Sequence, residues 1–188
     1  MRVALISDIH GNLSALEKVL ADLEHEPPDR ILCLGDIAAT GPQPHETVQR
    51  LRELDFPTVM GNTDAEILRS LSPMKVSDGA RRVSEIDRWC AGQLPEDDQE
   101  YLKRFTPTLE ADLDYGNELL CFHGSPLSFN DVITEATSER ELQRLFRGQN
   151  ATVMAGDTRT SSFSGSTEMQ KFSTRAASAW VQHKLSTQ

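Results

Sequence analysis

The segment Val3-Ala4-Leu5-Ile6-Ser7-Asp8-Ile9-His10-Gly11-Asn12 joins an apolar run directly to a group of polar residues. Four consecutive apolar residues predict a strand that is buried on both faces, as in a parallel sheet. Gly11 ends this run, and apolar residues then recur at helical spacing over 13–23. We therefore predict a strand–loop–helix unit whose loop carries Asp8 and His10.

Similar units follow along the chain. The segment 65–104 is charged and reads as helical, with Pro95 separating two helices. Strands that alternate with helices indicate an α/β fold with a largely parallel sheet. We predict further strands over 31–34, 57–60 and 151–154, paired strands over 108–114 and 118–122, and helices over 44–54 and 139–146.

The composition limits the classes of partner. The chain has 188 residues and a net charge of −10, with a pI near 4.9. Such an acidic surface repels nucleic-acid backbones and anionic membranes unless a local cation reverses the field. We expect no secretory leader and no membrane span, because only four apolar residues follow Arg2 and no apolar run approaches about 20 residues. Three cysteines without a C-x-x-C pair are typical of a reducing compartment, so we expect a cytoplasmic protein.

Polar residues stand where each predicted strand ends. In open parallel sheets, ligands bind outside the carboxyl ends of the strands, so these residues are expected to share one crevice. Carboxylate, imidazole and amide oxygen suit Mn²⁺, Fe²⁺, Zn²⁺ or Mg²⁺. Each residue alone is more often a helix cap or a turn residue, but the series favours a metal site. The candidates are Asp8, His10, Asp36, Asn62 and His123.

Four ordered motifs resemble those of the calcineurin-like metallophosphoesterases, and of their small bacterial and archaeal phosphodiesterase branch in particular. The resemblance covers residues 1 to about 156. It implies an α/β fold, a β-sandwich flanked by helices in the order αββα. The motifs are Asp8-Ile9-His10-Gly11-Asn12, Gly35-Asp36, Gly61-Asn62-Thr63-Asp64 and His123-Gly124.

The resemblance also implies a centre of two divalent ions, Mn²⁺ first, with Fe²⁺, Zn²⁺, Ni²⁺ or Mg²⁺ as alternatives. Asp8, His10 and Asp36 would hold one ion, and Asp36, Asn62 and His123 the other, with Asp36 bridging the two. Asp64 would orient a neighbouring ligand, and we count it with Asp36, Asn62 and His123 as catalytic. We assign substrate binding to Asn12 and Thr63.

Two departures from the family pattern matter for the chemistry. Many relatives carry a histidine after the motif-three asparagine, where it helps to protonate the leaving group, and here the residue is Thr63. The last metal motif of the family is Gly-His-x-His, whereas this chain reads Gly156-Asp157-Thr158-Arg159. Asp157 is a degenerate ligand candidate, but the guanidinium of Arg159 has no lone pair to offer a metal.

The segment after Gly156 is rich in Ser and Thr and follows no clear period. Codons read one base back would give Gly-His-Thr-His across 156–160 and Asn-Pro-Gly-Ser-Val-Gly across 173–179. We interpret 1–156 as the metallophosphoesterase core and 157–188 as a frameshifted tail that is not native to the fold. On this interpretation the last strands are missing and one sheet edge is exposed.

Three functional hypotheses follow. The first is a metal-dependent phosphoesterase that hydrolyses phosphomono- or phosphodiesters, acting on a small phosphoester or a nucleotide rather than on long nucleic acid. The second is a catalytically impaired remnant of such an enzyme, which lacks the last histidine ligands. The third is a nucleotide-binding regulatory module without chemistry.

The frameshift interpretation is tested by the gene itself. We expect the DNA to hold one extra base at the Gly156 codon, with following codons that encode His-Thr-His in the other frame. Sequencing this region from genomic DNA checks the expectation. A third base other than C in the codon of Asp157 or of Arg159 could not yield histidine in the shifted frame and would contradict it.

Overall fold

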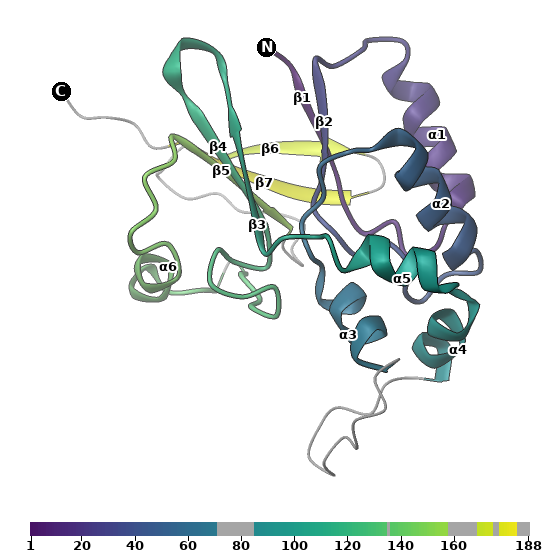
Figure 1. The fold of residues 1–188 in the computed structure, drawn as a ribbon. Coiled ribbons are helices and arrows are strands. Elements are labelled where there is room, and N and C mark those ends of the chain that lie inside the picture. Colours follow the sequence, from purple (N-terminus) through teal and green to yellow (C-terminus); the bar gives the residue numbers. More distant parts are fainter. Residues whose placement is uncertain (71–84, 135, 158–168, 175–176, 184–188) are drawn as a thin grey trace, which may run out of the picture.

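Two sheets packed face to face form the centre of the molecule (Figure 1). The computed structural model describes residues 1–70, 85–134, 136–157, 169–174 and 177–183. In the smaller sheet, β1 (Val3–Ile6) lies parallel to β2 (Arg30–Cys33). The larger sheet has the order β3 (Thr108–Asp112), β4 (Glu118–His123), β5 (Val153–Asp157), β7 (Ala177–His183) and β6 (Met169–Thr174).

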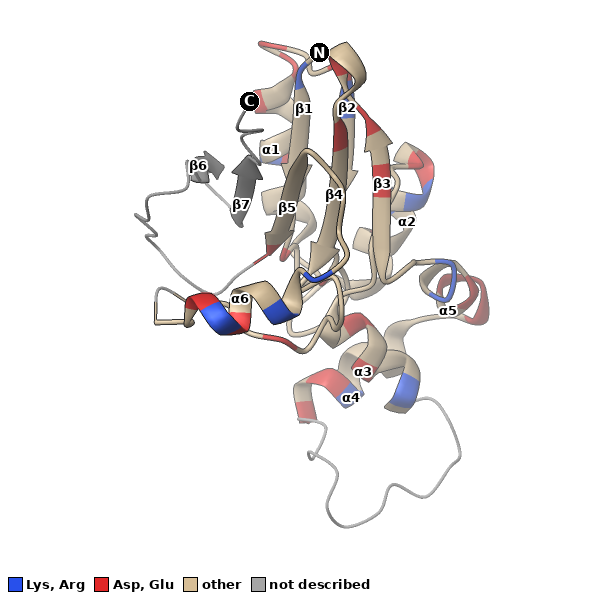
Figure 2. Ribbon diagram, turned by 90° about the vertical axis from the view of Figure 1, so that its left-hand side faces the viewer, with Lys and Arg blue, Asp and Glu red and all other residues tan. Residues whose placement is uncertain are grey.

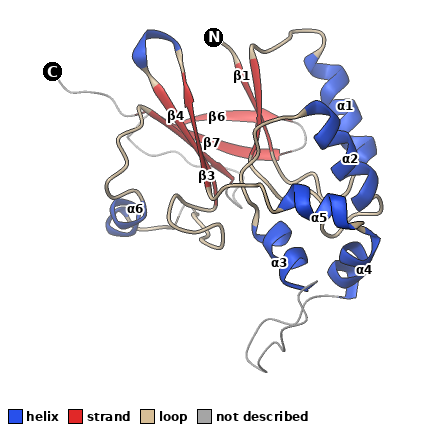
Figure 3. Ribbon diagram, viewed as in Figure 1, coloured by secondary structure: helices blue, strands red, loops and turns tan. Residues whose placement is uncertain are grey.

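Most helices lie beside the smaller sheet, whereas α6 lies beside the larger one (Figure 3). Capping side chains fix the starts of two helices. The Asn12 side chain accepts a hydrogen bond from the backbone N–H of Ala15 at the start of α1, and the Ser138 side chain accepts one from Glu141 N–H at the start of α6. The helices are α1 (Leu13–Leu23), α2 (Pro44–Leu54), α3 (Asn62–Ser70), α4 (Glu85–Gln93), α5 (Glu96–Leu102) and α6 (Glu139–Leu145).

Alternating side chains of the strands fill three apolar layers, because successive strand residues point to opposite faces. Leu5 and Leu32 pack between the sheets against Leu119 and Cys121. Ile6 and Cys33 face the helices α1 and α2, and Leu120 and Phe122 face Phe146 after α6. The predicted α/β sandwich flanked by helices is therefore confirmed.

Both sheets bring strand ends to one side of the molecule. β4 and β5 run parallel, and Figure 2 shows α6 near the ends at which they stop. The loops after β1 and β2 lead into the same region, because His123 at the end of β4 bonds to Leu34 after β2. The fold thus places the polar residues of four motifs around one point.

The structure corrects several predictions in detail. The predicted strand at 57–60 is reduced to bridges at Thr58 and Val59, and the strand expected at 151–154 lies at Val153–Asp157. The larger sheet is mixed rather than largely parallel, because β3 pairs antiparallel with β4 through a short turn. The predicted helices at 44–54 and 139–146 are confirmed, the second ending one residue earlier.

The expectation of missing C-terminal strands is also corrected. β7 pairs antiparallel with β5, and β6 pairs with β7. The unpaired backbone groups along an extended strand accept a neighbouring extended segment whatever the period of its side chains, so an aperiodic sequence does not exclude a strand. The assignment of 157–188 as foreign to the fold stays a prediction.

None of the described helices has the length and apolar character needed to cross a bilayer.

Leu51 on α2 tests the helix-facing core, since its side chain is fully buried there. We expect Leu51→Ala to lower the free energy of unfolding by about 2–5 kcal/mol through lost burial and a residual cavity. Urea unfolding followed by circular dichroism measures the change. Leu127→Ala, at a side chain that is 56% exposed, is the matched control and should shift stability by at most about 0.5 kcal/mol.

Candidate metal centre

The loops after β1 and β2 continue the pairing of the two strands beyond their ends. This pairing places Asp8 and His10 against Asp36, so the three side chains meet although 28 positions separate the first from the last. Three backbone hydrogen bonds hold the loops together: Asp8 N–H to Gly35 O (3.1 Å), His10 N–H to Asp36 O (2.9 Å) and Gly11 N–H to Ile37 O (2.6 Å).

All three of these side chains stand on left-handed backbone. The φ angles are 52° at Asp8, 49° at His10 and 59° at Asp36. A non-glycine residue in this region costs on the order of 1–3 kcal/mol, and it persists only where the surrounding structure imposes it. Strained residues of this kind gather at functional sites, so their coincidence here marks the loops as a site.

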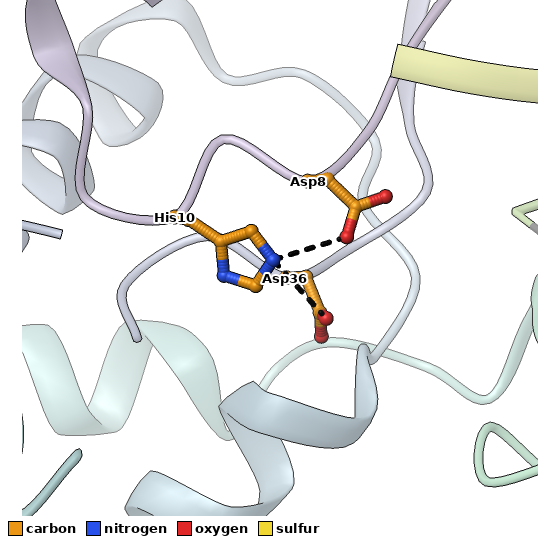
Figure 4. Close-up of side chains that lie close together, drawn as sticks. All are labelled: Asp8, His10 and Asp36. Carbon is orange, nitrogen blue, oxygen red and sulfur yellow. Dashed lines mark hydrogen bonds and ion pairs between the residues drawn. The ribbon is translucent and has the colours of Figure 1, made fainter. Parts of the chain in front are cut away.

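The three side chains point toward one another (Figure 4). His10 Nε2 lies 3.1 Å from Asp8 Oδ1 and 3.8 Å from Asp36 Oδ2. One potential ligand atom from each residue lies within 4.8 Å of the other two. The Asp36 side chain is 5% exposed, whereas those of Asp8 and His10 are 31% and 32% exposed. The centre therefore has a buried floor and an open side through which a substrate can enter.

His123 and Asn62 extend the group on the far side of Asp36. His123 Nε2 lies 3.0 Å from Asn62 Oδ1 and 3.7 Å from Asp36 Oδ2. The same Asp36 oxygen thus faces both imidazoles, and the Thr63 N–H donates to the other oxygen at 3.0 Å. The structure brings together all five residues that the sequence predicted as metal ligands, with Asp36 between the two histidines.

The orientation of the imidazoles shows that the donor set fits a cation. His10 Nδ1 faces Ala39 O at 3.2 Å, and His123 Nδ1 faces Leu34 O at 2.8 Å. A carbonyl oxygen only accepts, so Nδ1 carries the proton in both rings. In the neutral rings each Nε2 then turns a lone pair toward oxygen acceptors of the site. Such converging lone pairs need a positive charge among them, and Mn²⁺ or a similar ion suits this donor set.

The pKa shifts of Asp8 and His10 agree with concentrated negative charge at the site. Burial alone would raise the pKa of Asp8, but hydrogen bonds with His10 and Asp157 outweigh it and hold the pKa below its usual range. The hydrogen bond with Asp8 also raises the pKa of His10, against the effect of burial. The lowered pKa of Asp8 keeps a negative charge at the site, and the raised pKa of His10 reflects the carboxylates beside it.

Asp64 joins the loop of Asp36 to the start of α3. Its carboxyl group is fully buried and accepts N–H bonds from Asp36 and Ile37, each at 2.8 Å, and from Gly61 at 3.3 Å. Burial raises the pKa of Asp64 to about 6, because desolvation exceeds the effect of the backbone donors. Asp64 therefore holds the backbone at Asp36 in place, and its role of orienting a metal ligand stays a prediction.

Gly61 is required by the close approach of Asp36. A Cβ at this position would lie 2.1 Å from Asp36 Oδ1 and 2.3 Å from the Asp36 backbone nitrogen. A side chain on Gly61 would therefore displace the Asp36 carboxylate.

The remaining predicted residues have mixed outcomes. The Asn12 side chain caps α1, and its role in substrate binding stays a prediction. Thr63 has a buried Oγ1 with no partner among the described residues. Asp157 lies opposite His123 in β5 and hydrogen-bonds Asp8, so it borders the centre, whereas Arg159 lies outside the described residues. Sequence reasoning missed the carbonyls of Leu34 and Ala39, because a backbone group leaves no residue-type signal.

Comparison with known proteins agrees with this geometry. The model of the calcineurin-like phosphoesterase superfamily domain matches residues 1–173. A metallophosphoesterase structure from Sphaerobacter thermophilus has a TM-score of 0.60 at 29% identity, over 81% of this chain and 58% of that one. Hypothetical protein PH1004 from Pyrococcus horikoshii has a TM-score of 0.61 at 21% identity, over 78% and 64%. The chain therefore belongs to the calcineurin-like phosphoesterase superfamily.

A curated relative matches a shorter stretch. Uncharacterized protein MJ0912 of Methanocaldococcus jannaschii is 46% identical over 66 residues, which is 35% of this chain and 27% of that protein. The chain spans less than two thirds of the length of each of these three relatives.

Gly61→Ala tests how closely Asp36 is held. We expect the new methyl group to displace the Asp36 carboxylate and to weaken Mn²⁺ binding by about 10–100-fold, the range seen when support of a ligand is lost. Isothermal titration calorimetry with MnCl₂ measures the affinity. Gly92→Ala on α4, where a Cβ meets nothing within 4 Å, is the matched control. Equal Mn²⁺ affinity in both variants would contradict the assignment of Asp36 as a ligand.

Proposed function

We propose that this protein is a divalent-cation-dependent phosphoesterase that hydrolyses small phosphomono- or phosphodiesters at a dinuclear centre. The observation that carries the proposal is the convergence of Asp8, His10 and Asp36 within 4.8 Å on three left-handed residues. Membership in the phosphoesterase superfamily supports the reaction type. Manganese is our first choice of metal, because both carboxylates and imidazoles are present.

The five ligands divide into two sets that share one residue. Asp8, His10 and Asp36 would hold one ion, and Asp36, Asn62 and His123 the other. Bound ions would supply a Lewis acid for the phosphoryl oxygens and lower the pKa of an attacking water. The chain's own part is to orient these ligands: Asp64 and Thr63 N–H fix the Asp36 carboxylate, and backbone carbonyls fix both imidazole rings.

The charge of the chain supports a small anionic substrate that meets bound cations. A net charge of −10 repels a phosphoester everywhere except where cations are concentrated. The same charge disfavours long nucleic acid. We propose a phosphoester metabolite or a nucleotide as the substrate. We also propose a cytoplasmic location, because the cysteine pattern is typical of a reducing compartment.

One observation favours a second candidate, a catalytically impaired remnant. Asp157 stands at the end of β5, where relatives carry the first histidine of their last metal motif. An aspartate side chain offers a metal ion oxygen in place of the nitrogen of histidine, and the Asp157 carboxyl group already hydrogen-bonds Asp8. A remnant would bind Mn²⁺ weakly and turn over no substrate.

Hydrolysis of bis(4-nitrophenyl) phosphate tests the proposal. We expect Mn²⁺-dependent release of nitrophenolate that EDTA abolishes, and we expect Asp36→Asn to lower kcat/KM at least about 100-fold, because a bridging charge is lost. Absorbance at the nitrophenolate band measures the rate. Asp22→Asn on the exposed side of α1 is the matched control, with unchanged activity expected.

The possible results separate the candidates. Turnover that depends on Mn²⁺ and on Asp36 supports the phosphoesterase. Purified wild-type protein without turnover at saturating Mn²⁺, or turnover equal in Asp36→Asn and wild type, would overturn the proposal in favour of the remnant.

A further inference from the structure

We propose that the outer edge of β3 binds an extended, positively charged segment of a partner protein, which adds to the larger sheet as a further strand. Two features that lie side by side carry the proposal: an apolar groove between β2 and β3, and unpaired backbone groups of Glu110 on its wall. None of the residues that line the groove belongs to the candidate metal centre. The proposal therefore does not depend on the proposed phosphoesterase reaction.

The groove lies at the margin of the sandwich, between a strand of each sheet. Its volume is about 320 Å³, at the lower end of the range of ligand-binding pockets, about 300–1,000 Å³. Leu32, Leu109 and Ala111 line it and belong to the apolar layer between the sheets, where Leu109 and Ala111 are only partly buried. An apolar side chain of a guest segment would therefore extend the existing core.

The backbone of β3 has an unpaired outer edge beside this groove. Leu113 N–H bonds to Asn117 O at the β3–β4 turn, and bonding alternates from there, so the N–H and C=O of Glu110 point away from β4. Asp112 shares this outward direction, and its carbonyl accepts a bond from Arg30 Nη1 at 3.5 Å. Among the described residues, none bonds to the outward N–H or C=O of Glu110. This position is open to a neighbouring strand.

The adjoining part of the same margin is already paired in the manner of a strand. Cys33 N–H bonds to Pro57 O, and Val59 N–H bonds to Cys33 O, each at 2.9 Å. Val59 also forms a parallel bridge with Thr106, just before β3. Pro57 lines the groove, which begins where this pairing stops. An extended guest would continue along the margin the backbone pairing that the chain itself begins.

The charge of the edge selects the partner. Glu110 and Asp112 are exposed on β3, Glu118 is exposed opposite Asp112, and Figure 2 shows the acidic residues along β3. Arg30, the cation on the groove wall, is engaged with the Asp112 carbonyl. A second copy of β3 would bring like charges together across the new strand pair, which destabilises such pairs. Lysine or arginine side chains on a guest strand would instead face carboxylates.

Backbone pairing and side-chain contacts would then divide the recognition. In strand addition, main-chain hydrogen bonds supply affinity and pockets for alternate side chains supply specificity. Here the guest backbone would bond to the N–H and C=O of Glu110, and one apolar guest side chain would enter the groove. The cationic residues on either side would meet the acidic surface of β3 and β4.

The peptide Lys-Lys-Val-Thr-Val-Lys-Lys, with fluorescein at its N-terminus, tests the proposal on the intact chain. Fluorescence anisotropy measures its Kd, and hydrogen exchange followed by NMR locates the contact. We expect saturable binding that slows exchange of the Glu110 amide at least about 10-fold, because this amide gains a hydrogen bond. The Ala111 amide, which already faces β4, is the internal control. No binding at millimolar peptide, or binding that leaves Glu110 exchange unchanged, would overturn the proposal.

Two variants separate backbone pairing from charge. Glu110→Pro removes the outward N–H, a change that edge strands tolerate. We expect it to weaken peptide binding at least about 10-fold relative to Glu110→Gln, which loses the charge but keeps the N–H. Equal affinity of these two variants would contradict strand addition.

Glu110→Lys leaves the backbone unchanged and tests the charge even if the proline variant fails to fold. We expect it to weaken binding of the lysine peptide and to strengthen binding of the same peptide with glutamate in place of lysine. Glu24→Lys, at the exposed end of α1, is the matched control and should bind as the wild type does. Wild-type affinity of Glu110→Lys for the lysine peptide would overturn the choice of a cationic partner.

Sedimentation velocity of the protein alone tests a second copy as the occupant. We expect Glu110→Pro to leave the sedimentation coefficient unchanged. A dimer that this substitution dissociates would assign the edge to self-association and overturn the proposal.

Discussion

The structure depends on the backbone pairing of two loops beyond the ends of β1 and β2. Three hydrogen bonds between residues 8–11 and 35–37 hold Asp8, His10 and Asp36 in the left-handed region. This conformation costs free energy that the surrounding sandwich must supply. The side chains of both loops meet at a common point in this conformation.

The electrostatic consequence is a site that favours a cation. Carboxylate oxygens and imidazole lone pairs face one another around Asp36, and the backbone carbonyls of Ala39 and Leu34 prevent the rings from turning away. The same carbonyls decide which ring nitrogen carries the proton. One structural feature therefore orients both rings of the proposed metal centre.

The sequence predicted the fold class and the residues that meet around Asp36, because both follow from residue types. The apolar run before Asp8 and the helical spacing of 44–54 indicated the elements, and polar residues at strand ends indicated the residues of the candidate site. Backbone-determined features could not be predicted in this way, among them the left-handed Asp36, the start of α3 at Asn62 and the pairing of β7 with β5. These depend on contacts between distant segments rather than on local pattern.

Anomalous diffraction from crystals grown with Mn²⁺ tests the central claim most directly. The account predicts two manganese peaks about 3.5–4 Å apart, with the Asp36 carboxylate between them, Asp8 and His10 on one ion, and Asn62 and His123 on the other. Crystals whose manganese peaks lie away from Asp36, or which show no peak at saturating Mn²⁺, would contradict it.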